Sequence, residues 1–136
     1  MNLLNLFILS LLIIIIDGLW LFIISKKFLN MVRIIQNEKS SVNMLAAGLA
    51  YLFIIIQIKI FLIDQNATLF HAFLLGVTTY GIFDFTNLAL FNKYNVKIAL
   101  MDILWGGTLY TLVLLLYKVY VSYSSNKALK IDLFSK

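Results

Sequence analysis

The sequence predicts an all-α fold, a four-helix transmembrane bundle that forms a single integral membrane domain over residues 1–136. Hydrophobic residues make up 62% of the chain and charged residues 12%, which is about half the charged share of a soluble domain. The mean hydropathy is +0.98, and a soluble chain this short could not cover so much apolar surface. Proline is absent, which favours uninterrupted helices.

The first span is expected over residues 3–24. At about 1.5 Å per residue it exceeds a hydrocarbon core of roughly 30 Å. A signal peptide is the alternative, but a basic leading region is missing and Lys26 and Lys27 follow directly. Residues 25–42 are then expected as a polar loop, with an amphipathic turn over 27–35 in the headgroup region.

The second and third spans are expected over residues 43–63 and 68–91. Only a tight turn, 64–66, separates them, so they form a hairpin of antiparallel helices. Asn43 and the small residues that follow it open the second span, and small residues permit close helix contact. The other polar residues of this hairpin are expected together at its turn end, with Lys59 paired to Asp64.

The fourth span is expected over residues 96–121, after a turn at 92–95. Residues 122–136 form a basic tail that is expected at the membrane interface. Loops 25–42 and 92–95 fall on the same side of the membrane, which we name side A, and the opposite side is side B. Side A is expected to be cytoplasmic, because cytoplasmic loops are enriched in Lys and Arg. Its six basic residues, Lys26, Lys27, Arg33, Lys39, Lys93 and Lys97, compare with five toward side B, Lys59, Lys118, Lys127, Lys130 and Lys136.

Composition excludes several classes of function. The net charge is +5, but the basic residues sit in loops and the tail, so we expect the lipid bilayer as partner and no nucleic acid. Cysteine is absent, which excludes disulfide and thiolate chemistry. A single histidine, His71, excludes zinc, haem or di-iron sites built on several histidines.

Three aspartates inside the apolar spans are the candidate functional residues: Asp17, Asp84 and Asp102. A carboxylate in hydrocarbon is costly, so an intramembrane acid indicates function by default. Each lies six or seven residues from the side-A end of its span, or about 9–10 Å deep. We therefore expect the three acids in one layer.

Each aspartate has a polar or aromatic residue three positions later, on the same helix face. We expect a polar pocket open to side A. Its cation-binding or proton-relay groups would be Asp17, Asp84, Asp102 and Asn87, and its lining Trp20, Trp105, Tyr80, Thr86 and Asn43.

Three close carboxylates cannot all be ionised in a low dielectric. Either some are protonated or a cation lies among them. Oxygen ligands suit a hard cation such as Na⁺, Ca²⁺ or Mg²⁺, or an ammonium group. No particular metal and no other cofactor is predicted.

These residues resemble a family of predicted bacterial membrane proteins, domain of unknown function 2177. The similarity lies in Asp17-Gly-Leu-Trp-Leu, in Tyr80-Gly-Ile-Phe-Asp84-Phe-Thr-Asn-Leu-Ala, and in Asp102-Ile-Leu-Trp-Gly. The chain departs from the family in containing no proline. The resemblance implies four helices and the same acids, and it implies no activity.

The leading functional hypothesis is translocation or binding of a cation or proton, in a homo-oligomer because a pore within four helices is narrow. An alternative is an intramembrane enzyme that acts on a lipid or isoprenoid, with paired acids as general acid and base. A third is a structural component of a membrane or virion envelope, in which the acids lock helix packing. Whether the chain is an enzyme stays open.

Overall fold

The structure is a computed structural model that describes residues 2–38 and 41–134, and within them the chain is an all-helical bundle. Its elements are α1 (Leu3–Gln36), α2 (Met44–Ile58), a π-helical turn η1 (Lys59–Ile63) that continues α2, α3 (Leu69–Leu90) and α4 (Val96–Phe134). Four helices, with η1 counted as part of α2, are long and apolar enough to cross a membrane. The predicted fold class is confirmed.

Helix α1 is longer than the first predicted span, because it continues past residue 24 to Gln36. Its last turns bury Met31 against Tyr94 and Ala99, next to the α3–α4 turn. The expected loop 25–42 is therefore wrong over most of its length, since the apolar face of 27–35 packs on the bundle as helix. Asn37, with φ 56°, ends α1 in the left-handed conformation.

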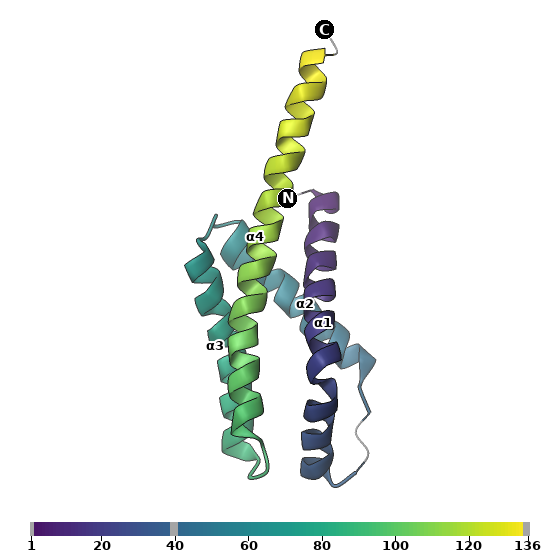
Figure 1. Cartoon of the computed structure of the whole chain (residues 1–136), viewed down its shortest axis with the longest axis vertical. Coiled ribbons are helices and arrows are strands. Elements are labelled where there is room, and N and C mark those ends of the chain that lie inside the picture. Colours follow the sequence, from purple (N-terminus) through teal and green to yellow (C-terminus); the bar gives the residue numbers. More distant parts are fainter. Residues whose placement is uncertain (1, 39–40, 135–136) are drawn as a thin grey trace.

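Helix α4 is also longer than predicted, since it runs through the expected tail to Phe134. It projects well beyond the other helices at the side-B end (Figure 1). Residues 122–134 therefore continue α4 as helix, and their expected position at the membrane interface stays a prediction. Two of the lysines counted in the charge comparison between the two sides lie outside the described residues, Lys39 and Lys136.

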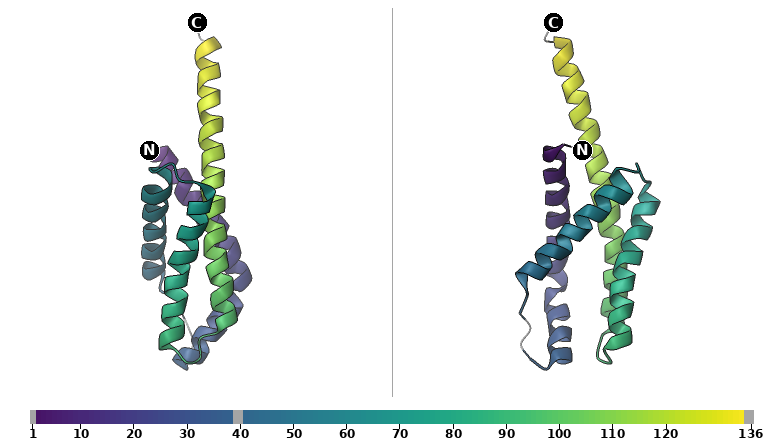
Figure 2. Two further views of the ribbon diagram at one scale, coloured as in Figure 1. Left: turned by 90° about the vertical axis from the view of Figure 1, so that its left-hand side faces the viewer. Right: turned by 180° about the vertical axis from the view of Figure 1, so that it is seen from behind.

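The helices alternate in direction and pack unequally. Helices α3 and α4 form the closest pair, α1 packs on α4, and α2 contacts α1 only lightly. Helix α2 crosses the bundle obliquely, whereas the other three run nearly along its long axis (Figure 2). Contact between α2 and α3 is sparse, so the two helices are not closely packed.

Glycines set the spacing between α3 and α4. A Cβ added to Gly76 would overlap the carbonyl oxygen of Gly106 and lie 2.9 Å from the Cα of Gly107. A Cβ on Gly107 would lie 2.7 Å from the Phe73 ring. Small residues let membrane helices approach until their backbones touch. These glycines therefore allow the close packing of α3 against α4.

The packed core lies where α1, α4 and the end of α2 meet. Its fully buried members include Leu9, Ile13, Ile58, Leu109 and Leu114. Large apolar residues such as Phe22 and Ile82 are 85% and 72% exposed. This exposure is expected of helices whose outer faces contact lipid.

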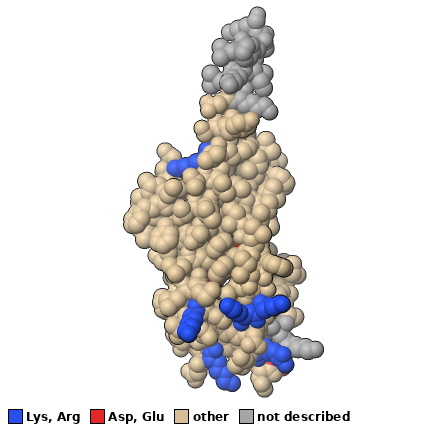
Figure 3. All heavy atoms as spheres, viewed as in Figure 1, with Lys and Arg blue, Asp and Glu red and all other residues tan. Residues whose placement is uncertain are grey.

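Three lysines and one asparagine on α1 and α4 mark a membrane-sized band. Lys97 and Lys118 on α4 are 21 residues apart, and so are Asn5 and Lys26 on α1, which gives about 32 Å in each case. This matches a hydrocarbon core of roughly 30 Å. Lys and Arg gather at the side-A end in the view of Figure 3, with a smaller group toward side B.

Replacing Gly76 with alanine should lower the stability of the bundle by about 1–3 kcal/mol, because the added methyl group would overlap Gly106. Gly81 is the matched control, because its added Cβ would have no neighbour within 4 Å. Gly81→Ala should be neutral or stabilising by about 0.5–1 kcal/mol through helix propensity. Denaturation in detergent micelles measures both, and equal effects would contradict the glycine contact.

Candidate functional site

Two aspartates and two tryptophans join α1 to α4 in a reciprocal arrangement, which we name the Asp–Trp clasp (Asp17, Trp20, Asp102 and Trp105). The indole Nε1 of Trp105 donates to Asp17 Oδ1 at 2.9 Å, and Trp20 Nε1 donates to Asp102 Oδ1 at 3.2 Å. Each helix therefore supplies one donor and one acceptor to the other.

The two indole rings of the clasp stack on each other, with centroids 4.8 Å apart and planes at 10°. Because α1 and α4 are antiparallel, the two Asp-x-x-Trp segments are related by an approximate two-fold axis that passes between the rings. Such an offset stack is worth roughly 0.5–1.5 kcal/mol beyond the buried area. The two partly buried tryptophans thus contact each other between α1 and α4.

Asp17 is the most completely paired of the three acids. Its second oxygen, Oδ2, accepts from the Tyr51 hydroxyl of α2 at 2.7 Å, and its side chain is buried. Asp17 therefore ties together α1, α2 and α4. Hydrogen bonds to both oxygens meet the requirement that polar groups in the membrane interior be paired.

Asp84 takes no part in the clasp. It is fully buried on α3, and its Oδ1 accepts from the Tyr94 hydroxyl at 2.8 Å. Its Oδ2 is the buried side-chain polar atom without a hydrogen-bond partner among the described residues. Burial and the hydrogen bond to Asp84 raise the pKa of the Tyr94 phenol, so Tyr94 remains a donor. The pair holds the α3–α4 turn on α3.

Asp17 lies about one helical turn deeper than Asp84 and Asp102, so the expected layer of acids spans about 6 Å. Asp84 and Asp102 are each six residues from the helix end at the α3–α4 turn. Asp17 is nine residues before Lys26 and Asp102 five after Lys97, or about 14 Å and 8 Å inside the band. Asp17 is deeper than expected because the depth is counted here from Lys26 rather than from residue 24.

The other predicted site residues are divided between different surfaces. Asn87 lies beside the Tyr94 phenol, close to Asp84. Asn43 caps α2 by accepting from the Ala46 N–H at 3.1 Å. Thr86 is exposed in a shallow outer groove of α3, whereas Tyr80 lines an inner cavity.

That cavity has a volume of about 520 Å³ and lies between α2 and α3, with Asp102 of α4 in its wall. Most of its lining is apolar, and the polar exceptions are Asp102, Gln57, Thr79 and Tyr80. Several lining residues, including Phe53 and Phe83, are exposed on the outer faces of α2 and α3. The cavity therefore opens laterally, toward lipid.

A polar network missed by sequence reasoning borders this cavity. Gln57 Nε2 donates to Thr79 Oγ1 at 3.0 Å, and the Tyr110 hydroxyl donates to Gln57 Oε1. Gln57 was expected at the hairpin end, but it faces the bundle interior. Two polar side chains inside the second apolar span, Gln57 and Tyr51, could have indicated this network from the sequence.

The carboxylates do not converge on one point. Within residues 2–38 and 41–134, the structure holds no group of three or more His, Cys, Asp or Glu side chains that could bind a metal ion. Asp17 and Asp102 are brought together through the tryptophans, and Asp84 is held separately. Each carboxylate is therefore a separate hydrogen-bond acceptor, and the three do not form a common cation site in the described residues.

The fold and this site define a small multi-span helical membrane protein with paired intramembrane acids. The chain belongs to the family described as predicted membrane protein (DUF2177), whose model matches residues 2–118. This confirms the resemblance seen in the sequence. No curated protein and no solved structure matches the chain.

Replacing either clasp tryptophan with phenylalanine should abolish the exciton coupling of the stacked indoles in far-ultraviolet circular dichroism. The chain has two tryptophans, so each variant leaves one isolated indole. Tyr123→Phe is the control, because that side chain is 70% exposed. A wild-type spectrum equal to the sum of the two single-tryptophan spectra minus that of the variant lacking both tryptophans would contradict the stack.

Tyr94→Phe should destabilise the protein by about 1–3 kcal/mol, because it leaves the buried Asp84 carboxyl without its donor. Adding Asp84→Leu to that variant should restore much of the loss, since removing both polar partners can be nearly neutral. Unfolding in detergent measures the cycle. Additive losses in the double variant would show that the two side chains are not coupled.

Proposed function

We propose that this membrane protein binds a bilayer-dissolved amphiphile whose head carries a hydrogen-bond donor, a hydroxyl or an ammonium group. The observation that carries the proposal is Asp102 in the wall of the lateral cavity. Its Oδ1 accepts from Trp20, and Oδ2 is available to a ligand as an acceptor. A carboxylate exposed to an apolar, lipid-facing cavity is costly unless something pairs with it.

The dimensions of the cavity support a ligand of this kind. About 520 Å³ falls within the roughly 300–1,000 Å³ typical of small-molecule sites, which combine apolar walls with a few polar groups. Ile54, Phe61 and Phe83 supply such walls. The sparse contact between α2 and α3 gives an alkyl or isoprenoid chain a route in from the bilayer.

The polar groups select the head of the amphiphile. An ionised carboxylate is only an acceptor, so Asp102 favours ammonium or hydroxyl and repels phosphate or carboxylate. Gln57 already uses one N–H toward Thr79, and its second N–H can donate to a hydroxyl oxygen. A hydroxyl head can therefore use both residues, whereas an ammonium head uses Asp102 alone.

The clasp would hold Asp102 in place for this role. Trp20 fixes one carboxylate oxygen, and its stack on Trp105 fixes Trp20. A positioned acceptor loses little conformational entropy when it binds a ligand. Of the cations expected from the sequence, the ammonium group is the one that this proposal keeps, as the head of the amphiphile. A hard cation would have to bind to a single carboxylate.

Single-chain photoactivatable probes of equal length test the proposal in lipid nanodiscs, with alcohol, amine or carboxylate heads. The alcohol and amine should label the α2 and α3 residues that line the cavity, and the carboxylate about tenfold less, because it lacks a charge-assisted hydrogen bond worth about 1.5–3 kcal/mol. Asp102→Asn keeps an acceptor for Trp20 and should reduce amine labelling more than alcohol labelling.

A steric variant gives the matched control. Ala50 lines the cavity, so Ala50→Phe should block all of the probes. Ala89→Phe adds the same bulk in the outer groove of α3 and should leave labelling unchanged. Equal labelling by all three heads, or labelling that survives Ala50→Phe, would refute the proposal.

A further inference from the structure

A second pocket, of about 410 Å³, lies at the side-B end of the bundle and is separate from the lateral cavity. It is bordered by α1, by the turn after η1 and by α4. Its polar lining comes from Asn5, Asp64, Asn66, Tyr117, Lys118 and Ser122, and its apolar lining from Ile63, Leu114 and Val121. We infer that this pocket binds the phosphate group of a membrane phospholipid, with Lys118 as its cationic ligand.

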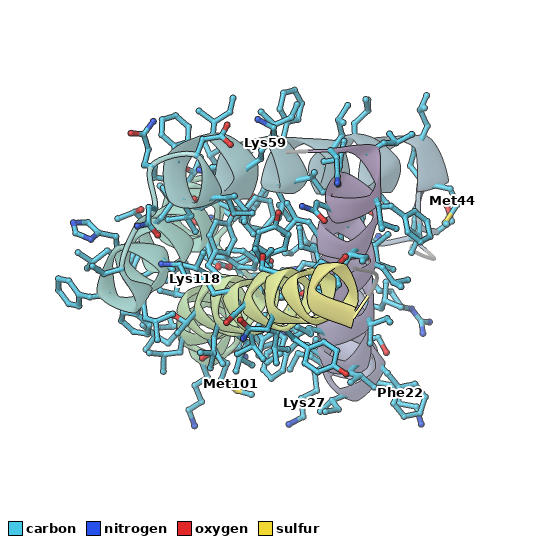
Figure 4. All side chains as sticks on the ribbon, turned by 90° about the horizontal axis from the view of Figure 1, so that it is seen from above. Phe22, Lys27, Met44, Lys59, Met101 and Lys118 are labelled. Carbon is cyan, nitrogen blue, oxygen red and sulfur yellow. The ribbon has the colours of Figure 1, made fainter. Side chains whose placement is uncertain are left out.

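Lys118 carries a positive charge that no carboxylate neutralises in the described part of the chain. Its Nζ donates to the backbone carbonyl of Ala67 at 2.7 Å, and the recorded salt bridge joins two other residues, Lys59 and Asp64. An ammonium has three N–H donors, so two remain for a ligand. Figure 4 looks down on this end, with Lys118 on α4 directed toward the start of α3.

The one carboxylate in the pocket is already neutralised. Lys59 Nζ lies 2.6 Å from Asp64 Oδ2, and the π-helical turn makes this contact possible. In that turn the Asp64 N–H donates to the Lys59 carbonyl five residues earlier, at 2.9 Å, which stacks the two side chains. The pocket and its border therefore carry a net charge of +1 from Lys59, Asp64 and Lys118, which suits a singly charged phosphodiester.

The neutral groups fit the same ligand. Asn66 and Ser122 offer amide and hydroxyl donors beside Lys118, and phosphate oxygens accept several such bonds. Ile63 and Val121 form the apolar part of the lining. A phospholipid presents this same order, a phosphate followed by glycerol and acyl chains.

The depth of the pocket favours a lipid over a soluble phosphate. Lys118 lies about 32 Å along α4 from Lys97, so both lysines stand at the edges of a hydrocarbon core of roughly 30 Å. The pocket thus lies at headgroup level. π-Helical turns are rare and frequently occur at functional sites, and η1 leads directly into this lining.

Lipid retention tests the inference. The purified protein is exchanged into detergent with phosphatidylcholine or with the matched diacylglycerol, which lacks the phosphate, and bound lipid is counted by native mass spectrometry. We expect at least fivefold more phosphatidylcholine to be retained, loss of that preference in Lys118→Gln, and its recovery in Lys118→Arg. Lys97→Gln, at the opposite edge, is the matched control and should keep the preference.

Two further arms sharpen the outcome. Lys59→Gln should also weaken retention, because Asp64 would then repel the phosphate. Competition with inorganic phosphate distinguishes the sources, since a lipid site should resist millimolar phosphate and a site for soluble phosphate should not. Equal retention of the two lipids, or an unchanged preference in Lys118→Gln, would overturn the inference.

Discussion

Pairing of polar groups in hydrocarbon is the constraint on which this structure depends. Within a membrane each carboxylate needs donors from the protein itself. Asp17 and Asp102 obtain theirs from tryptophans on the opposite helix, so α1 and α4 must lie side by side at one register. Interhelical hydrogen bonds in membranes are each worth only about 0.6–1.7 kcal/mol, but two reciprocal bonds and a ring stack restrict the register jointly.

The unequal packing of the helices follows from the distribution of small residues. Gly76, Gly106 and Gly107 bring α3 and α4 into backbone contact. Helix α2 begins with small residues, but Gly48 has no neighbour within 4 Å of an added Cβ. Helix α2 is instead held near its middle by Tyr51 and Gln57. This leaves room for a lateral cavity on its α3 side.

The sequence predicted the helices and the identity of the central residues better than their pairing. Spacing of three residues suggested that Asp17 would associate with Trp20 on its own helix, whereas the structure pairs it with Trp105. The Asp-x-x-Trp motif occurs in both antiparallel helices. A two-fold axis between two such motifs pairs the aspartate of each helix with the tryptophan of the other, so the repeated motif indicated the observed pairing. Tyr51 could not be found from the acids alone, since its role depends on the oblique crossing of α2.

The ends of the helices could not be predicted from hydropathy. Hydropathy shows where an apolar span ends, but not whether the helix continues beyond it. The segment after residue 24 is polar enough for a loop, but Met31 finds a tertiary partner in Tyr94 and continues the helix. That contact only exists once the α3–α4 turn has formed.

The two proposed binding sites call for different ligands. Asp102 and Lys118 are 16 residues apart on α4, or about 24 Å, so one polar head cannot reach both. Their charges also select opposite chemistry, since a carboxylate prefers a donor and an ammonium prefers an anion. A lipid held at side B therefore leaves the lateral cavity free. On these two proposals, the bundle would bind a phospholipid at its edge while a smaller amphiphile exchanged between α2 and α3.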